Sequence, residues 1–329
     1  MGQLGDGTNT DRPLPGQTGI ADDWVAVAAS SYNLAINKKG ELWAWGNNTN
    51  GQLGNGTTTH LNIPTRVEGD GKHNWVTVAA GSGHSLGIRG EGELWAWGRN
   101  SLGSIGDDTT TQRPTPVRIG TAGDWVAVAA GDNHSLAINK KGELWAWGYN
   151  YYGQIGDGSG VTRRIPTRVG TDSDWLMVTS GTSKSMGLRE AEGRRELWSW
   201  GRGVYGALGN GSTANSRYPT KVIGDNWITV LLGSNHGMAI RQDEGKLELW
   251  GWGLNGNGQI GDGYKTNRLS PVQIPGENWI AVSAGIYHSL GMREINGKRA
   301  LWAWGSNNFG QLGDGTTTQR LNPVQVIGK

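Results

Sequence analysis

Hydrophobic and polar residues alternate in short runs along this chain, and the same order of runs returns about every fifty residues. In one unit, residues 125–131 (WVAVAAG) are small and β-branched, which is typical of a buried strand. Residues 134–140 (HSLAINK) alternate apolar and other side chains, and residues 143–148 (ELWAWG) put Trp145 and Trp147 on one face. The pattern predicts three consecutive strands joined by tight turns.

A fourth strand is expected in the proline-bearing segment of each unit. There, "PTRV" or "PVRI" follows a glycine-rich stretch of the type "GQLGDGTTT". Because proline has no N–H to donate to a ladder, this strand should lie at an outer edge of its sheet. One unit therefore predicts a four-stranded antiparallel meander.

Tryptophan marks the repeat most clearly. Leu-Trp-x-Trp-Gly occurs six times, a third tryptophan precedes each pair, and these account for all 18 tryptophans of the 329 residues. A period near fifty residues, with glycine and aromatic residues at fixed positions, favours the blades of a β-propeller. In such a fold, neighbouring sheets cover one another's apolar faces. We expect the paired indoles to fill the space between blades. The first tryptophans of the pairs are Trp43, Trp95, Trp145, Trp198, Trp250 and Trp302.

The segments "AAGxxHSLAI", "ELWAWG" and "GQLGDG", in this order and at this spacing, resemble the repeat of the regulator of chromosome condensation (RCC1) family. The resemblance covers essentially the whole chain and implies a single β-propeller domain over residues 1–329. Members of the family usually have seven blades. They include an exchange factor for a small GTPase, a plant ultraviolet-B receptor and a β-lactamase inhibitory protein.

The number of repeats departs from that family norm. Segments of the "GQLGDG" type occur seven times, whereas the Leu-Trp-x-Trp-Gly strand occurs six times. We expect six complete blades plus an N-terminal partial repeat, in which "RPLPGQTGI" would be an outer strand. Two ways of closing the ring stay open: six blades with a spare segment, or seven blades of which one lacks three strands.

Composition narrows the possible partners. The 30 Lys and Arg residues nearly balance 28 Asp and Glu, for a formal charge of +2 without a concentrated basic stripe, so nucleic acid is not an expected partner. Cysteine is absent, which excludes disulfides and thiolate metal sites. No apolar run reaches 18 residues and no signal peptide is recognised, so we expect no membrane contact and leave the compartment open.

Candidate chemistry is sparse. His84, His134, His236 and His288 recur at one repeat position, with Asn33 and Lys184 assigned to it elsewhere, and a structural histidine bonded to a loop backbone is the expected role. The acidic residue of "GDGTTT" is replaced by asparagine in two repeats, which favours an Asx turn over a calcium loop. No phosphate loop or catalytic triad is present. We expect no cofactor, no metal and no enzymatic activity.

The turns after the first and third strands of an up-and-down sheet emerge at the same end, and there the sequence stops repeating itself. Tyrosine, arginine and the only phenylalanine gather in these turns, which is the composition of a protein-recognition surface on a rigid scaffold. The candidate partner-binding residues are Tyr32, Arg99, Leu102, Tyr149, Tyr151, Tyr152, Lys184, Arg202, Tyr205, Tyr287 and Phe309.

The sequence thus predicts a non-catalytic scaffold that binds a macromolecule, most simply a protein. Two alternatives stay open: a carbohydrate-binding propeller, because aromatic faces suit sugar rings, and the exchange-factor activity that the resemblance implies. Light sensing is not expected, since the first turns, such as "SGH" and "DNH", carry no tryptophan. Self-association through the N-terminal segment is a further possibility.

Overall fold

The computed structural model describes residues 1–18, 23–68 and 74–326. Regular structure in this part of the chain consists of β-strands and one short 3-10 turn, Val204–Gly206. No helix within it has the length and apolar character needed to span a bilayer. The chain forms two compact units: residues 1–10 with 16–183 (unit 1), and residues 11–15 with 184–329 (unit 2).

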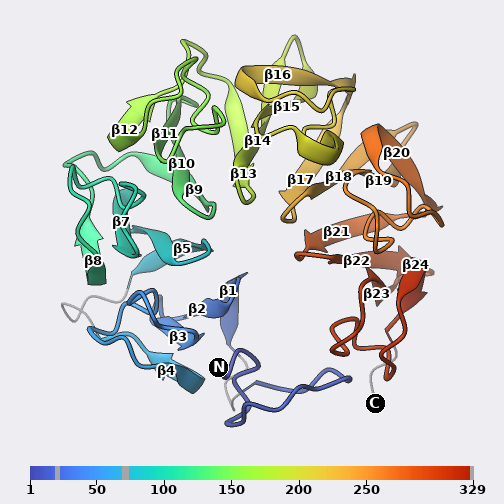
Figure 1. Ribbon diagram of the computed structural model, residues 1–329, viewed down its shortest axis with the longest axis horizontal. Helices are drawn as coiled ribbons and strands as arrows, with labels where there is room; N and C mark the ends of the chain where they lie inside the picture. The colour runs from blue at the N-terminus through green and yellow to red at the C-terminus, as the bar shows by residue number, and fades with distance from the viewer. Residues whose placement is uncertain (19–22, 69–73, 327–329) are drawn as a thin grey trace. The chain divides into compact units, whose positions relative to one another are not determined.

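Each sequence repeat forms one four-stranded sheet with its strands in chain order, as Figure 1 shows. Unit 1 holds three complete sheets and one further strand: β1 Trp24–Ala29, β2 Tyr32–Asn37, β3 Leu42–Gly46, β4 Leu61–Arg66; β5 Trp75–Ala80, β6 His84–Arg89, β7 Glu93–Gly98, β8 Arg113–Arg118; β9 Trp125–Ala130, β10 His134–Asn139, β11 Leu144–Gly148, β12 Arg163–Arg168; and β13 Trp175–Ser180.

Unit 2 continues the same pattern: β14 Lys184–Ala191, β15 Arg194–Gly201, β16 Ser216–Asp225; β17 Trp227–Leu232, β18 His236–Asp243, β19 Lys246–Gly253, β20 Arg268–Glu277; and β21 Trp279–Ala284, β22 His288–Ile295, β23 Lys298–Gly305, β24 Arg320–Gln325. The predicted four-stranded antiparallel meander is confirmed for the six repeats. The proline-bearing strand is the outer edge strand, as in β12 with its Pro166. The N-terminal partial repeat and the way the ring closes stay predictions.

Residues 1–18 contain turns and bends but no strand. Within unit 1, the N–H of Gly7 donates to the carbonyl of Asn62 at 2.9 Å, and the Trp45 indole donates to the carbonyl of Gln3 at 3.1 Å. Within unit 2, the N–H of Gly315 donates to the carbonyl of Pro13 at 3.1 Å. The first ten residues are therefore bonded into unit 1, and residues 11–15 into unit 2.

The second tryptophan of a pair packs between adjacent sheets, as Trp97, Trp147 and Trp304 do. Trp147 of β11 is fully buried in one cluster with Leu86 and Ile88 of the preceding sheet. Its indole N–H donates to the carbonyl of Ser104 at 2.8 Å. The first tryptophan of the pair, Trp145, stays half-buried and packs edge-on against Trp125, with 5.9 Å between ring centroids. This confirms that paired indoles pack between sheets, the second of each pair more deeply than the first.

The close approach of backbone and indole requires glycine in the loop before the outer strand. Gly54 has a φ of +78°, and a Cβ there would lie 2.8 Å from Nε1 of Trp97 in the next sheet. A side chain would be both strained in this left-handed conformation and in collision with the ring. The same contact recurs at Gly106 with Trp147 and at Gly261 with Trp304, so glycine in these "GQLGDG" segments lets the loop lie directly on a tryptophan of the next sheet.

In five of the six sheets, a hydrogen bond joins the turn after the first strand to the turn after the third strand. The first residue after the third strand donates its N–H to a carbonyl in the turn after the first strand. The pairs are Asn47 with Ser31, Arg99 with Gly83, Tyr149 with Asn133, Leu254 with Asn235, and Ser306 with Tyr287. The expected placement of both turns at one end is therefore confirmed for these five sheets.

Candidate functional site

The strongest candidate site is a group of three tyrosines in the turn after β11, here called the tyrosine cluster: Tyr149, Tyr151 and Tyr152. The rings of Tyr149 and Tyr151 are stacked, with centroids 6.4 Å apart and planes 10° apart. Tyr152 stands edge-on to Tyr151 at 5.0 Å. Tyr151 is 67% exposed, whereas its two neighbours are half-buried. The cluster presents one open aromatic face supported by two packed rings.

The backbone beneath the tyrosine cluster is fixed by local hydrogen bonds. Tyr152 N–H donates to Oε1 of Gln154 at 3.0 Å. Asn150 is fully buried and its side chain bonds across the whole loop, donating to Asp157 at 3.0 Å and accepting from the Ile155 N–H at 2.9 Å. The cluster is therefore carried on a loop that is ordered by its own polar core.

Arg99 borders this site in unit 1, but its charge is already engaged. Its guanidinium donates to the carbonyl of Asp132 at 2.8 Å and to Oδ1 of Asn133 at 2.7 Å. These bonds tie the turn after β7 to the turn after β9 of the next sheet. Leu102, in the same turn as Arg99, is half-buried. Arg99 thus braces the loops, and its remaining polar surface is small.

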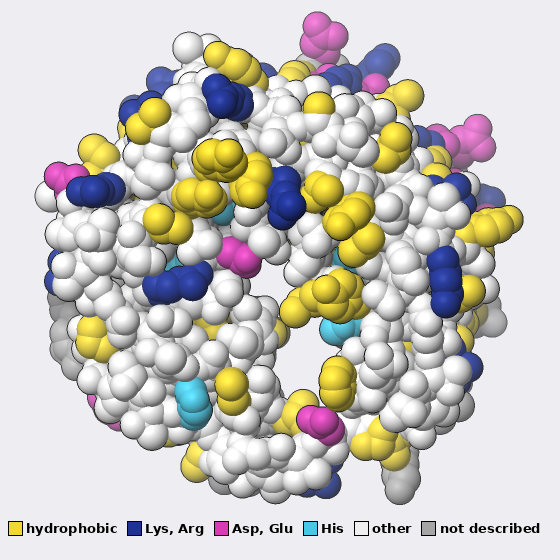
Figure 2. All heavy atoms as spheres, viewed as in Figure 1, with side chains coloured by type: hydrophobic (Ala, Val, Ile, Leu, Met, Phe, Trp, Pro, Cys, Tyr) yellow, Lys and Arg dark blue, Asp and Glu magenta, His cyan; other side chains and the backbone are white. Residues whose placement is uncertain are grey.

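Unit 2 carries the other predicted residues in its own turns. Tyr205, Tyr287 and Phe309 are exposed, Phe309 most of all at 71%, and Arg202 is half-buried. Tyr205 has a φ of +62°, a left-handed conformation that is uncommon for an aromatic residue. Figure 2 shows exposed hydrophobic side chains on the viewed face, separated by polar side chains and backbone. In the part of the chain that the structure describes, Tyr205, Tyr287 and Phe309 have no stacked or edge-on partner ring, unlike the tyrosine cluster of unit 1.

The prediction that Tyr32 and Lys184 bind a partner is wrong, because both side chains are buried. The Tyr32 hydroxyl lies inside unit 1, donating to the carbonyl of His84 at 2.7 Å and lying 2.7 Å from Oγ of Ser85. Lys184 lies inside unit 2 and donates to the carbonyls of Gly233 and Ser234. Both side chains link one sheet to the next and cannot contact a partner.

Strand register also corrects the position assigned to the histidines. Tyr32 pairs with Gly46 as His84 pairs with Gly98, so Tyr32, and not Asn33, shares the histidine position. Two of these histidines bond a serine of the next sheet rather than a loop backbone: His84 Nε2 lies 2.9 Å from Oγ of Ser135, and His236 Nε2 lies 2.9 Å from Oγ of Ser289. Burial first, and then the nearby His134 and Arg99 charges, lower the pKa of His84 to about 3. The imidazole is therefore neutral at physiological pH.

The acidic loop residues form the expected Asx turns. In all seven glycine-rich loops the Asp or Asn side chain accepts the N–H two residues on, as Asp107 does from Thr109 at 3.1 Å. Arg113 pairs with Asp107 at 2.6 Å. Burial opposes ionisation of Asp107, but hydrogen bonds from Thr109, Arg113 and Asn100 outweigh it and hold the pKa below its ordinary value. These carboxylates already have full sets of protein donors.

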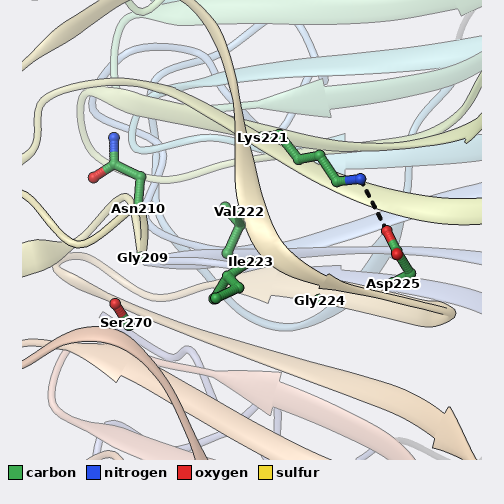
Figure 3. A pocket seen from close by; sticks show the side chains of 8 residues that line it. All are labelled: Gly209, Asn210, Lys221, Val222, Ile223, Gly224, Asp225 and Ser270. Carbon is green, nitrogen blue, oxygen red and sulfur yellow. Dashed lines mark ion pairs between the residues drawn. The ribbon is translucent and has the colours of Figure 1, made fainter.

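A hollow in unit 2, shown in Figure 3, has a volume of about 530 Å³. Asn210 and Ser270 face the strand from Lys221 to Asp225 across it. Lys221 Nζ pairs with Glu196 at 2.5 Å and with Asp225 at 3.0 Å, and these hydrogen bonds raise its pKa. With its lysine paired in this way, the hollow offers little to orient a ligand.

Exposed tyrosines outside the predicted set were missed. Tyr218 on the outer strand β16 is 63% exposed, and Tyr264 in a glycine-rich loop lies beside Arg268, whose guanidinium carbon is 5.2 Å from the ring centroid. Both stand alone, without a second ring, and so resemble ordinary surface aromatics. Tyr264 follows "GDG", where the other repeats have threonine or serine, and this exception could have marked it in the sequence.

Family profiles and a known protein both match along nearly the whole chain. The profile of the RCC1-like domain matches residues 1–291, and profiles of the RCC1 repeat match residues 279–311 and 300–329. The ultraviolet-B receptor UVR8 of Arabidopsis thaliana is 32% identical over 333 residues, covering 98% of this chain and 62% of the receptor. The chain thus spans less than two thirds of that relative's length.

Solved structures share the fold. Human WBSCR16 superimposes with a TM-score of 0.83 at 20% identity, covering 96% of this chain and 84% of that one. Prp20p of Saccharomyces cerevisiae gives a TM-score of 0.80 at 21% identity, covering 93% and 77%. Together with the repeated sheets and their tryptophans, the match of the RCC1-like domain profile over residues 1–291 shows that the chain belongs to the RCC1-like domain family of β-propellers.

Proposed function

We propose that this chain is a non-catalytic scaffold that binds a protein partner, with the tyrosine cluster of unit 1 as its main contact. The observation that carries the proposal is the stacked and edge-on arrangement of Tyr149, Tyr151 and Tyr152 with one ring open to solvent. Tyrosine is enriched at the energetic centres of protein interfaces, because it buries a large area and also offers a hydroxyl.

The loop that carries the tyrosine cluster is already ordered without a partner, which supports a role in binding. A partner that docks on a mobile loop loses affinity to the cost of ordering it. Here the Tyr149 N–H donates to the Asn133 carbonyl at 2.8 Å, and the buried Asn150 fixes the rest of the turn. The aromatic face is thus held in place before binding, so most of the contact energy is available for affinity.

Relatives provide a second line of support. One solved structure in the family is described as Kap60 bound to yeast RCC1 (Prp20), and another reports binding of Prp20p to Gsp1p and histones. Those partners are proteins, and they belong to those relatives. For this chain we propose the partner class alone. We do not propose exchange-factor activity, since identity to Prp20p is 21% and the shared property is the fold.

Replacing Tyr149, Tyr151 and Tyr152 together with alanine tests the proposal. Affinity capture from the native source, with mass spectrometry, should recover a protein with the wild-type chain and lose it with the triple variant. Interface hot spots of this kind contribute about 2 kcal/mol or more, which corresponds to about 30-fold weaker binding. The melting temperature should fall little, and for the single variant Tyr151→Ala it should not change, because that ring is mostly exposed.

Tyr218→Ala is the matched control, since Tyr218 is as exposed as Tyr151 but stands alone on an edge strand. Capture that survives the triple variant, or that Tyr218→Ala also abolishes, would contradict the assignment of the tyrosine cluster. A glycan array with the same three chains separates the carbohydrate alternative. If a glycan binds through the tyrosines and no protein is captured, the partner of the tyrosine cluster is a sugar and not a protein.

A further inference from the structure

Three hairpins of unit 2 share one kind of turn, and one of the three differs in its chemistry. Each turn has two residues between the last paired residues of its strands, and both have positive φ. They are Glu192 with Gly193, Glu244 with Gly245, and Asn296 with Gly297. Antiparallel hairpins with such turns favour Asn-Gly. Here the turn between β22 and β23 has Asn-Gly, and the other two have Glu-Gly.

An asparagine before a glycine can react with its own backbone. The glycine amide nitrogen attacks Cγ of the asparagine side chain, a C–N bond forms, and the side-chain nitrogen leaves as ammonia with the amide proton. The product is a five-membered succinimide. A glutamate at the same position presents a carboxylate, which is a poor electrophile, and would form a six-membered ring. The turn between β22 and β23 therefore differs from the other two in its ability to react.

The sequence contains five other Asn-Gly pairs, all in glycine-rich loops. In four of them the glycine N–H already donates to a carbonyl: Gly51 to Asn48 at 3.0 Å, Gly56 to Pro114 at 2.9 Å, Gly211 to Leu269 at 2.9 Å, and Gly258 to Asn255 at 2.8 Å. In the fifth pair, Asn255 and Gly256, the Asn255 side chain is fully buried and donates to Asp262 at 2.9 Å. Attack at these five pairs requires the loop to open first.

Asn296 has none of these restraints. Asn296 and Gly297 are both exposed, and no described residue hydrogen-bonds to the Asn296 side chain or accepts the Gly297 N–H. A Cβ built on Gly297 would meet nothing within 4 Å. The tip of this hairpin can therefore rotate into the geometry of attack without losing a tertiary contact.

We propose that Asn296 is a site of spontaneous modification, at which water converts the asparagine through a succinimide into isoaspartate and aspartate. Water that opens the ring at the main-chain carbonyl carbon leaves Gly297 attached to Cγ, which is isoaspartate. Opening at Cγ gives aspartate. Isoaspartate adds one carbon to the backbone, so the two-residue turn no longer fits the pairing of Ile295 with Lys298.

Ageing of the purified full chain in mildly alkaline buffer tests this proposal. Peptide mass spectrometry follows the change from amide to acid, and methylation by an isoaspartyl methyltransferase identifies isoaspartate. Conversion at Asn296 should be about tenfold or more faster than at any of the other five pairs, because those loops must open first. The matched control is Asn296→Glu, which copies the turns at Glu192 and Glu244 and should remain unmodified at this position.

Hydrogen exchange gives the second arm. In the aged chain the amides of residues 294–299 should lose protection, whereas freshly prepared Asn296→Asp should keep it, because Asp-Gly fits the same turn. Conversion at Asn296 that is no faster than at Asn55 or Asn210 would overturn the proposal. So would ageing that yields aspartate without isoaspartate, or an aged chain in which residues 294–299 exchange as slowly as in the fresh one.

Discussion

At the scale of single residues, one position on the second strand links each sheet to the next, and it accepts different chemistry. Tyr32 and His84 both reach a serine hydroxyl of the following sheet, and Lys184 reaches backbone carbonyls instead. A buried polar group costs free energy unless it is paired, so what the position requires is a hydrogen bond and not a particular residue. This explains why sequence alone did not mark Tyr32 and Lys184 as buried.

The buried histidines make stability depend on pH. Burial, followed by the charges of Lys184 and His288, lowers the pKa of His236 from 6.5 to about 3. The unfolded chain therefore binds more protons below pH 6.5, and stability should fall as pH drops from 6.5 towards 3, by at most about 1.4 kcal/mol per pH unit for each histidine. Urea unfolding between pH 7.5 and 4.5 measures this slope.

His236→Gln removes one titrating group while keeping a side chain that can reach Ser289. Its stability should be lower at pH 7.5 but should decline less steeply towards pH 4.5. A slope identical to that of the wild-type chain would show that His236 binds protons equally in the folded and unfolded states, so that folding does not lower its pKa.

At the scale of the sheet, the two tryptophans of a pair have different roles: the second packs between sheets, and the first lies nearer the surface. Trp147 is fully buried between sheets and bonded to Ser104, whereas Trp145 is half-buried and packs on Trp125. Ala137 lies in the same buried cluster as Trp147. The sheet is therefore a unit that completes its core only against a neighbour.

Trp147→Ala should be far more damaging than Trp145→Ala. Truncating a fully buried indole leaves a cavity and removes one of the two hydrogen bonds that the Ser104 carbonyl accepts, for which we expect a loss of about 3–5 kcal/mol. Trp145→Ala retains the seal between sheets and should cost clearly less. Chemical denaturation of both variants provides the comparison, and equal losses would contradict the separate roles.

Particular residues show how much could be predicted from the sequence. Strands β9, β10 and β11 lie within one residue of the ranges expected from alternation and tryptophan spacing, and the Asx turns follow from the Asp/Asn exchange. The tyrosine cluster was located, but its stacking was not, since ring geometry depends on the loop's internal hydrogen bonds. Leu301, which is 37% exposed, could not be distinguished from its buried equivalents Leu42, Leu94, Leu144, Leu197 and Leu249, because exposure depends on what lies against a sheet.

At the scale of the whole molecule, the tryptophans are spread evenly, three to a repeat, and serve packing within and between sheets. The relative UVR8 is an ultraviolet-B receptor, but in this chain the turns after the first strands hold no tryptophan. A light response needs indoles whose excitation disturbs an interface. We therefore expect none here.

Sedimentation velocity before and after ultraviolet-B illumination checks this expectation. The sedimentation coefficient should be unchanged, with intrinsic tryptophan fluorescence as a control for photodamage. A reversible change in mass on illumination would assign a sensing role to indoles that the packing assigns to the core.

The bond between the turns of each sheet has an evolutionary consequence. Because it joins a backbone N–H to a backbone carbonyl, such as Tyr149 to Asn133, it survives any side-chain exchange at those tips except to proline at the donor. Mutations at these tips therefore change the side chains on the surface without weakening the hydrogen bond that holds the turns together. Descendants of such a chain are thus free to acquire new binding specificities one hairpin at a time.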